Sequence, residues 1–243
     1  GRAIAEGLAE ARADVAVIDL AEDGARETAD RVRALGKRAI AQRGDTSHPD
    51  DVEEFAASVA DSWGGIDVWV NNAGRLLVRP FLEMTHAEWH TLLGTNLHGY
   101  YYGCHAAARR MSEQGRGRII NISSVTRQQA ISDMTAYITA KAAITGLTRS
   151  LALELGPRGI TVNAIAPGAT DTALSADAYT PDVRSVYESR IAVGRIAKPH
   201  DLAGAAVCLA SDEASYVTGH ELLVDGGLLI NGNVGFAPSP ASE

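Results

Sequence analysis

The stretch that decides the fold is "GRIINISSVTRQQAISDMTAYITAKAAITGLTRSLALELGPRGITVNAIAPG", residues 117–168. Residues 117–124 and 160–168 are continuous apolar runs of strand length, and residues 135–155 between them carry apolar side chains at helical spacing. Continuous rather than alternating apolar runs are typical of strands that are buried on both faces, as in a parallel sheet. The stretch therefore predicts one strand–helix–strand unit.

The same alternation continues toward both ends of the chain. Strands are predicted at 14–20, 38–45, 66–74 and 221–225, and helices at 22–35, 50–63, 85–111 and 200–211. Thr85 followed by Glu88 is a capping box that marks the start of the longest of these helices. Repeated units of this kind predict an α/β fold, a Rossmann-type doubly wound parallel sheet with helices on both faces.

We expect a single domain over residues 1–230. Within it, residues 170–195 lack a strand, and an excursion of that length in a compact domain is typical of a lid over an active site. Residues 231–243 are predicted to be a loose tail.

The composition is that of an ordinary folded domain. With 243 residues, of which 46% are hydrophobic and 21% charged, the chain is long enough to bury one α/β core. No apolar run approaches the roughly 20 residues that cross a bilayer, and no signal-peptide pattern opens the chain, so a cytoplasmic protein without membrane contact is expected. The net charge of −8 argues against nucleic-acid binding, because a phosphate backbone needs a basic surface.

Cysteines and histidines offer no evident metal site. Cys104 and Cys208 are the two cysteines, and they lie far apart without the C-x-x-C spacing of a zinc site. Both are predicted to be small buried residues. The seven histidines form no convincing cluster, so we predict chemistry without a metal.

Asp19 is the first candidate for cofactor binding. It ends the strand "VAVID" about 20 residues after a glycine that opens a helix, where a dinucleotide-binding fold places the acid that holds the adenosine ribose. An acid at this point accepts a hydrogen bond from the 2′-hydroxyl and repels a 2′-phosphate, so NAD is favoured over NADP. The alternative is a strand-end aspartate that merely starts a turn.

The phosphate-binding loop is represented by Gly1 alone, its last glycine. A Rossmann half needs its central first strand, so we expect about 15 to 25 further residues, one strand and a glycine-rich turn, ahead of Gly1. The alternative is a chain that starts at Gly1 and holds a nucleotide poorly.

Three further strand ends carry candidate cofactor contacts. Asp45 in "GDT" can accept a hydrogen bond from the adenine amino group, and the small residues of "NNAG" (71–74) let the backbone approach a cofactor. Thr172, after "PG" at 167–168, is placed to contact the nicotinamide amide. The predicted cofactor set at these ends is Asp45, Thr46, Asn72, Ala73, Gly74, Pro167, Gly168, Thr170 and Thr172.

A tyrosine and a lysine on the helix at 135–155 carry the predicted chemistry. Tyr137 and Lys141 are four residues apart and therefore share one face of that helix. Hydride transfer from an alcohol to a nicotinamide needs a group that takes the hydroxyl proton. A nearby ammonium lowers the pKa of a phenol, so Lys141 can activate Tyr137 and also hold the nicotinamide ribose. Ser124 can polarise the substrate oxygen, and Asn96 can distort its helix and hold a water linked to Lys141.

These residues closely resemble the short-chain dehydrogenase/reductase family over essentially positions 1 to 230. The motifs that carry the resemblance are "NNAG" (71–74), Asn96, Ser124, "YITAK" (137–141), "PGATDT" (167–172) and "LLVDGG" (222–227). The resemblance implies that Tyr137 is the acid/base, Ser124 orients the substrate, Lys141 binds ribose and tunes Tyr137, and Asn96 completes a proton relay. It also implies a homotetramer, or a homodimer, built on the two long helices. One departure is Arg12, which stands where many members have the glycine that ends the first helix.

The substrate is left to loops. Thr126, Arg127, Gln128 and Gln129 are polar, as is Arg75, and they suit a polyhydroxylated substrate unless they point to solvent. The predicted substrate contacts are Arg75, Ser124, Thr126, Gln128 and Tyr137. Much of the chain resembles the bacterial sugar 1-dehydrogenases of the family, the L-rhamnose type in particular. Alternatives are a 3-oxoacyl-carrier-protein reductase and, in a different class, a non-catalytic binding protein with this fold.

Overall fold

A computed structural model describes residues 1–231. The predicted tail, 231–243, lies outside the described residues except for Asn231. Within residues 1–231 the strands are β1 (Val15–Asp19), β2 (Ala39–Arg43), β3 (Val68–Asn71), β4 (Gly117–Ile122), β5 (Ile160–Pro167) and β6 (Glu221–Val224). The α-helices of this part are α1 (Arg2–Glu10), α2 (Glu22–Ala34), α3 (Pro49–Trp63), α4 (His86–Leu93), α5 (Gly99–Gln114), α6 (Thr135–Leu155), α7 (Pro181–Arg190) and α8 (Ala203–Ala210). Every predicted strand is confirmed, and the helix predicted at 135–155 has those bounds.

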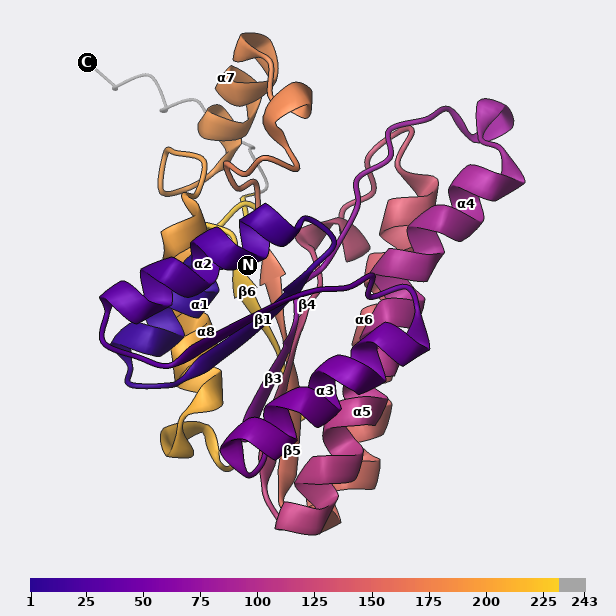
Figure 1. Ribbon diagram of the computed structural model, residues 1–243. Coiled ribbons are helices and arrows are strands. Elements are labelled where there is room, and N and C mark those ends of the chain that lie inside the picture. Colours follow the sequence, from indigo (N-terminus) through magenta and orange to yellow (C-terminus); the bar gives the residue numbers. More distant parts are fainter. Residues whose placement is uncertain (232–243) are drawn as a thin grey trace, which may run out of the picture.

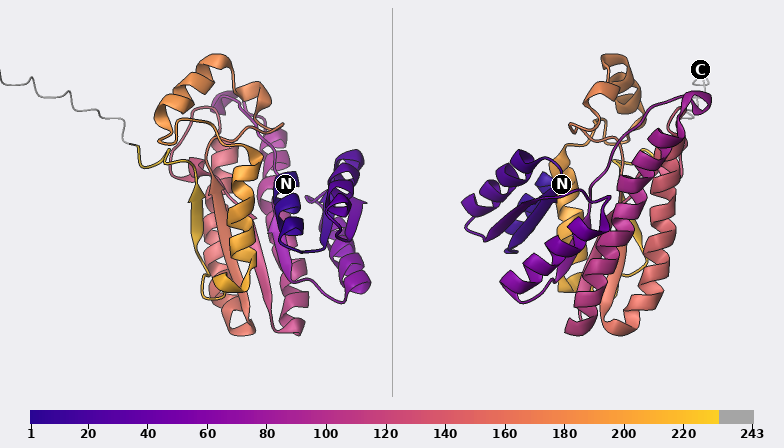
Figure 2. Two further views of the ribbon diagram at one scale, coloured as in Figure 1. Left: turned by 90° about the vertical axis from the view of Figure 1, so that its left-hand side faces the viewer. Right: turned by 45° about the vertical axis from the view of Figure 1, so that its right-hand side comes forward.

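The strands pair in parallel, and helices cover both faces, as Figures 1 and 2 show. Helices α3, α5 and α6 lie on one face, and α1, α2 and α8 lie on the other. The predicted fold class is thereby confirmed. None of the helices within residues 1–231 combines the length and the hydropathy needed to cross a bilayer.

The sheet is divided into two parts. Strands β3, β4, β5 and β6 are hydrogen-bonded in that order, whereas β1 and β2 pair with each other and with no other strand of the described residues. Seven of the eight residues of β5 are buried, whereas four of the five residues in each of β1 and β2 are half-buried and the fifth is exposed. The apolar core is therefore densest around β4 and β5.

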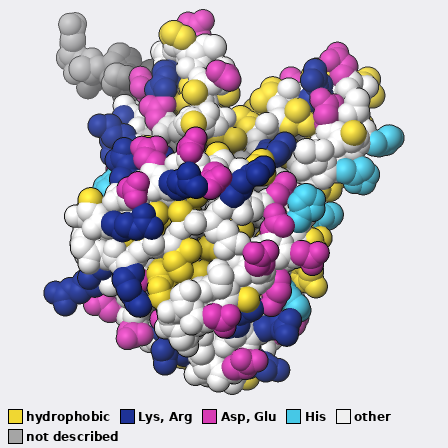
Figure 3. Space-filling model, in the orientation of Figure 1, with side chains coloured by type: hydrophobic (Ala, Val, Ile, Leu, Met, Phe, Trp, Pro, Cys, Tyr) yellow, Lys and Arg dark blue, Asp and Glu magenta, His cyan; other side chains and the backbone are white. Residues whose placement is uncertain are grey.

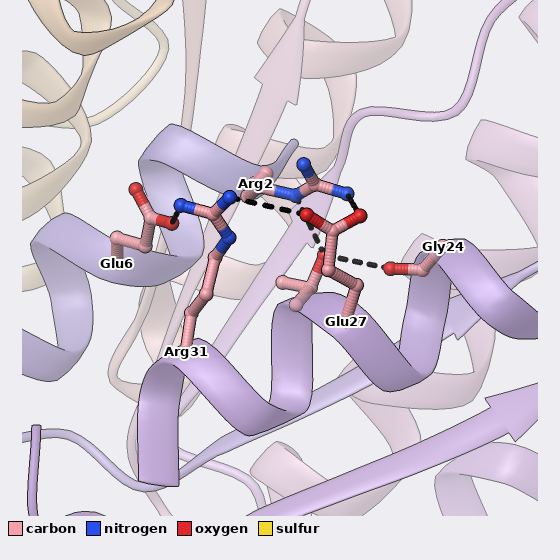
Figure 4. A network of polar contacts seen from close by, with 6 residues as sticks. Arg2, Glu6, Gly24, Glu27 and Arg31 are labelled. Carbon is pink, nitrogen blue, oxygen red and sulfur yellow. Dashed lines mark hydrogen bonds and ion pairs between the residues drawn. The ribbon is translucent and has the colours of Figure 1, made fainter. Parts of the chain in front are cut away.

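An ion-pair network joins α1 to α2 (Figure 4). Arg2 on α1 contacts Glu27 on α2 at 2.6 Å, and Arg31 on α2 lies 3.1 Å from Glu27 and 3.4 Å from Glu6. These side chains are about half exposed except for Glu6, and ion pairs exposed in this way contribute little to stability. Their main effect is to fix the position of the helix that starts at the predicted phosphate loop.

The prediction of one continuous helix at 85–111 is wrong, because the helix is interrupted in its middle. The capping box of Thr85 and Glu88 starts α4 as predicted, but residues Gly94–His98 form a π-helical turn before α5 begins. Asn96 in this turn is completely buried, so the predicted distortion at Asn96 is confirmed. A π turn inserts an extra residue into the helical repeat and often accompanies a functional side chain.

The buried position predicted for Cys208 is also wrong. Cys104 is buried on α5, but Cys208 is exposed. The buried residues of α8 are Ala203, Ala206 and Leu209, which recur at helical spacing and place residue 208 on the outer side.

The excursion 170–195 contains the helix α7 and projects from the carboxyl ends of the strands (Figure 1). The rings of Tyr179 and Tyr187 contact each other with centroids 5.5 Å apart and planes tilted by 59°, and both pack on the apolar cluster that includes Val125 and Ile191. The segment around α4 forms a second projection, and the surface is hollowed between the two (Figure 3). This hollow lies on the side of the sheet where parallel α/β folds bind ligands.

Candidate active site

The predicted site residues come together at the carboxyl ends of β3, β4 and β5. Asn72 follows β3, Ser124 follows β4 and Gly168 follows β5. Gly1 also reaches this edge, because a Cβ atom on Gly1 would lie 2.9 Å from the side-chain amide of Asn72. Residues that are far apart in sequence thus line one edge of the sheet.

Buried asparagines hold the strand ends in register. Asn71 Nδ2 donates to Asn121 Oδ1 at 2.8 Å, and Asn121 Nδ2 donates to Thr148 Oγ1 of α6 at 3.0 Å. The side-chain amide of Asn71 therefore makes its hydrogen bonds inside the sheet and does not face the site. Asn72, Ala73 and Gly74 remain as the part of "NNAG" that faces outward, and Asn72 is exposed.

Asn96 holds the turn that follows β3. Its Oδ1 accepts from the backbone N–H of Arg75 at 2.7 Å, and its Nδ2 donates to the backbone carbonyl of Arg75 at 2.8 Å. A Cβ atom on Gly74 would lie 3.8 Å from Asn96 Oδ1 and 3.9 Å from Lys141 Nζ. Asn96 thus lies close to Lys141, but its direct partner is the backbone of Arg75.

Ser124 and Tyr137 meet at the mouth of the site. Ser124 caps the 3₁₀ turn Val125–Arg127, and its Oγ accepts from the backbone N–H of Thr126 at 3.2 Å and from the Thr126 hydroxyl at 3.0 Å. Burial raises the pKa of the Tyr137 phenol, and a hydrogen bond with Ser124 opposes that rise. The serine hydroxyl therefore connects the loop after β4 to the phenol on α6.

Lys141 is buried behind Tyr137. Its Nζ donates to the phenol oxygen of Tyr100 at 3.0 Å and to the backbone carbonyl of Ile122 at 2.7 Å, and it lies 5.8 Å from the centre of the Tyr137 ring. Tyr100 in turn donates to the same carbonyl of Ile122 at 2.9 Å. The sequence reasoning did not identify Tyr100, although its place four residues after Asn96 on the same helical segment was a usable signal.

Burial governs the pKa values of these groups. It lowers the pKa of Lys141 to about 7 and raises the pKa of Tyr137 above its usual value, with Ser124 opposing the second change. Burial also raises the pKa of Tyr100 well above its usual value. The predicted lowering of the Tyr137 pKa by Lys141 is therefore not the dominant effect, because both groups are removed from water and the ammonium is turned toward Tyr100 and Ile122.

Asp19 and Asp45 lie at the ends of the two paired strands β1 and β2. Asp19 Oδ1 accepts from the backbone N–H of Ala21 at 2.9 Å, and Asp19 Oδ2 has no hydrogen-bond partner among the described residues. Burial raises the pKa of Asp45, but the hydrogen bonds from Ser47 outweigh it and hold that pKa below its usual range. A hollow of about 410 Å³ adjoins them, lined by Leu20, Arg43, Gly44, Asp45, His48 and Asp51.

The loop after β5 brings Gly168 against the next strand end. A Cβ atom at Gly168 would lie 2.7 Å from the Cα of Asp225, so this position accommodates only glycine. Thr170 is buried and donates to the carbonyl of Gly168 at 3.0 Å, whereas Thr172 is exposed and lies 3.1 Å from Ser175 Oγ. Pro167 ends β5. An exposed Thr172 hydroxyl is accessible to a ligand at this edge.

The polar loop predicted to contact substrate is largely engaged within the protein. Thr126 is buried against Ser124, and the Arg127 side chain, 12% exposed, pairs with Glu221. Gln128 is exposed, and its side-chain oxygen in the satisfied amide orientation accepts from Arg127 at 2.6 Å. Arg75 is exposed, and its charge adds to the hydrogen bonds from Ser47 that hold the pKa of Asp45 below its usual range.

Comparisons with known proteins agree with this geometry. The family described as "Enoyl-(Acyl carrier protein) reductase" matches residues 1–229. The chain belongs to this short-chain dehydrogenase/reductase family. The short-chain dehydrogenase/reductase described here is therefore an oxidoreductase, as the resemblance of its motifs implied.

Relatives of this short-chain dehydrogenase/reductase act on CH–OH groups. It is 41% identical over 237 residues to L-rhamnose 1-dehydrogenase (NAD(P)(+)) of Azotobacter vinelandii, with 95% of this chain and 93% of the relative covered. It is 35% identical to 3-oxoacyl-(acyl-carrier-protein) reductase FabG of Vibrio cholerae, with 94% and 92% covered. The solved gluconate 5-dehydrogenase of Burkholderia cenocepacia, in complex with NADP and tartrate, has a TM-score of 0.90 and 33% identity, with 95% and 91% covered.

Proposed function

We propose that the protein transfers a hydride reversibly between a nicotinamide cofactor and a secondary alcohol or carbonyl, with Tyr137 as the acid/base. The observation that carries this role is the contact of the Tyr137 phenol with the Ser124 hydroxyl at the sheet edge, with the buried ammonium of Lys141 behind the ring. The cofactor supplies the hydride chemistry when it is bound, and the residues of the chain orient the reactants and move the proton.

Each residue has one proposed task. Tyr137 Oη takes the proton of the substrate hydroxyl during oxidation and returns it during reduction. Ser124 Oγ donates a hydrogen bond to the same substrate oxygen. Lys141 holds the nicotinamide ribose and supplies positive charge behind the phenol, and Asn96 fixes the turn at Arg75 beside it. The cofactor contacts proposed at the other strand ends are those predicted from the sequence.

NAD is the proposed cofactor, with NADP less favoured. Asp19 supports this choice, because its Oδ2 is free of hydrogen bonds within residues 1–231 and stands at the end of β1 beside the hollow next to β2. A carboxylate there accepts from a ribose 2′-hydroxyl and repels a 2′-phosphate. The side of that hollow formed by Leu20 and Gly44 carries no polar side chain and suits the flat face of an adenine.

A sugar or polyol is the proposed substrate. The support is the similarity to L-rhamnose 1-dehydrogenase over 95% of the chain. The polar loop supports it less than the sequence suggested, because Thr126 and Arg127 have internal partners. A 3-oxoacyl thioester is the second candidate, and the similarity to the FabG relative favours it.

The experiment that tests the chemistry uses Tyr137→Phe and two substrate panels. The unaltered protein is assayed with NAD and NADP against free aldoses and polyols, and with NADH and NADPH against acetoacetyl thioesters. We expect turnover of a sugar, its loss in Tyr137→Phe, and NADH binding that is retained in the variant. No turnover of any sugar would reject the substrate, and full activity of Tyr137→Phe would reject the acid/base role. NADH binding without any turnover would favour a non-catalytic binding protein.

A further parallel strand between β1 and β3 is proposed to complete the sheet. The support is that β1 and β3 each have an edge without a strand partner among the described residues. A version of the chain that carries a strand and a glycine-rich turn ahead of Gly1 is then expected to bind NADH more tightly than residues 1–243. Equal affinity of the two versions would contradict this proposal.

Assembly into a homotetramer is proposed through α5 and α6. A groove of about 530 Å³ runs between these helices, lined by residues that include Tyr101, Arg109, Leu151 and Glu154. Leu153 on α6 is 82% exposed and Tyr101 on α5 is 52% exposed, which are high values for apolar side chains on adjoining helices. Size-exclusion chromatography with light scattering measures the mass of the assembly, and Leu153→Arg is expected to lower that mass.

The cytoplasmic location stays a prediction.

A further inference from the structure

Glu221 is a carboxylate that the chemistry described above does not use. It begins β6, and its side chain is only 6% exposed. Its Oε1 lies 2.5 Å from Nε of Arg127, whose side chain is also nearly buried, and the same oxygen accepts from the hydroxyl of Ser123. Its Oε2 accepts from the hydroxyl of Thr145 at 3.0 Å. Both oxygens of a buried carboxylate are thus engaged by groups from other elements.

The three partners belong to the segments that carry the reacting groups. Ser123 immediately precedes Ser124, and Arg127 ends the 3₁₀ turn that Ser124 caps. Thr145 lies on α6 eight residues after Tyr137, on the same face as Tyr137 and Lys141, because the three follow one another at intervals of four. Glu221 therefore bridges the serine loop to the helix of the catalytic tyrosine and lysine.

Stability alone does not account for this arrangement. The desolvation of two buried charges offsets most of their attraction, so a buried ion pair is often no more stabilising than apolar side chains of similar size. What Glu221 does provide is direction, because it accepts hydrogen bonds from Ser123 and Thr145 and forms a close ion pair with Arg127, whose Nε–H makes no hydrogen bond of its own within residues 1–231.

We propose that Glu221, paired with Arg127, is a positioning residue that sets the approach of the Ser124 hydroxyl to the Tyr137 phenol. The inference rests on the proposed acid/base role of Tyr137. A small displacement of a reacting group is enough to matter, since a misplacement of about 1 Å can cost on the order of 100-fold in rate.

Three variants and one control test the kinetics. Glu221→Gln keeps the hydrogen-bonding shape but removes the charge, Arg127→Met leaves the carboxylate buried without its cation, and the double variant removes both charges. Arg118→Met is the matched control, because Arg118 is 13% exposed and pairs with Asp212 near the opposite end of β4. We expect kcat to fall about 10-fold in Glu221→Gln and about 100-fold in Arg127→Met, with partial recovery in the double variant and NADH affinity within twofold throughout. Arg118→Met should keep its kcat.

A second readout does not depend on turnover. The ¹³Cζ chemical shift of Tyr137 reports the hydrogen bond at its phenol oxygen, and Ser124→Ala should move it at constant pH. Glu221→Gln is expected to move it in the same direction, and Arg118→Met to leave it unchanged. Failure of the proposed function would appear as an unaltered protein that turns over no substrate, yet the Tyr137 signal would still respond to Glu221. An unchanged signal in Glu221→Gln, or an unchanged kcat in both single variants, would overturn the positioning role.

Discussion

The two parts of the sheet differ although the same kind of sequence builds both. In β5, seven consecutive residues are buried, and buried asparagines link β3, β4 and α6 through hydrogen bonds of 2.8 and 3.0 Å. In β1 and β2, most residues are half-buried, and the two strands pair only with each other among the described residues. The part that holds Ser124, Tyr137 and Lys141 is thus the more deeply buried one, whereas the strands that end at Asp19 and Asp45 are only half-buried.

The tasks proposed for the two parts differ in what they require. Proton transfer requires groups held at hydrogen-bonding distance, which a dense, fully partnered environment provides. Recognition of an adenosine ribose requires a carboxylate at a strand end and tolerates more local motion, since the ligand itself adds contacts when it binds.

The largest expected effect is on the catalytic side. Lys141→Met removes the ammonium behind Tyr137 and should lower kcat by roughly 10²- to 10⁴-fold, the usual contribution of a group that assists general acid/base catalysis. The measurement is kcat at steady state, with the substrate identified from the aldoses, polyols and thioesters assayed above. A kcat within threefold of the unaltered protein would show that the buried lysine is only a core residue.

Hydrogen exchange tests the comparison directly. Amides of β4 and β5 should exchange mainly through global unfolding, whereas those of β1 and β2 should exchange through local opening, at least about 100-fold faster. Backbone exchange measured at the level of single amides distinguishes the two. Equal protection in the two parts of the sheet would mean that they unfold as one unit and do not differ in the free energy of opening.

Cofactor choice is the next effect in size. Asp19→Ala removes the carboxylate at the end of β1, so the proposed preference for NADH over NADPH should fall about 10- to 100-fold, while kcat with NAD at saturation stays near its original value. Titrations of protein fluorescence with both reduced cofactors measure it. Asp23→Ala, which makes the same change of charge on an exposed residue in the first turn of α2, is the control. A loss of preference in both variants would point to net charge rather than to Asp19.

Burial of Lys141 makes stability depend on pH. Its pKa is about 7 in the folded protein and 10.5 in an exposed side chain, so between these values the unfolded chain binds more protons and stability rises with pH. Above about pH 9 the raised pKa values of Tyr100 and Tyr137 act in the opposite direction. From pH 7 to 9 the lysine should add on the order of 1 to 3 kcal/mol to the free energy of unfolding. Urea titrations of the unaltered protein and Lys141→Met show it as a rise that the variant lacks, and parallel curves would reject it.

The sequence was sufficient for the order of the elements and for the placement of the predicted central residues at one edge of the sheet. Strand ends could be located because a buried strand is a continuous apolar run, and the pair Tyr137 and Lys141 because helical spacing places residues four apart on one face. The helix break at Gly94–His98 is visible in sequence only as a run of poor helix formers, since a π turn depends on the partner that Asn96 finds in the backbone of Arg75.

Residues that act through distant partners could not be found in this way. Tyr100 and Glu221 contact Lys141 and Thr145, which are 41 and 76 residues away. Sequence polarity also assigned Thr126 and Arg127 to solvent or substrate, because a loop pattern does not show which polar groups will find partners inside the protein. The direction of the Tyr137 pKa shift could not be predicted for the same reason, because it depends on burial and on where the Lys141 ammonium points.

The smallest effect concerns Arg12, on the less firmly held side. Arg12 follows α1 with a φ of 80°, a left-handed conformation that costs a residue with a Cβ roughly 1 kcal/mol or more and that glycine adopts freely. Arg12→Gly should therefore raise the free energy of unfolding by about 1 kcal/mol, or the melting temperature by about 2 to 4 °C. Arg12→Ala is the matched control, because it removes the same side chain but keeps the Cβ and the strain. A gain in both variants would place the effect in the exposed guanidinium, whereas a gain in Arg12→Gly alone would place it in the backbone at the end of the helix that precedes β1.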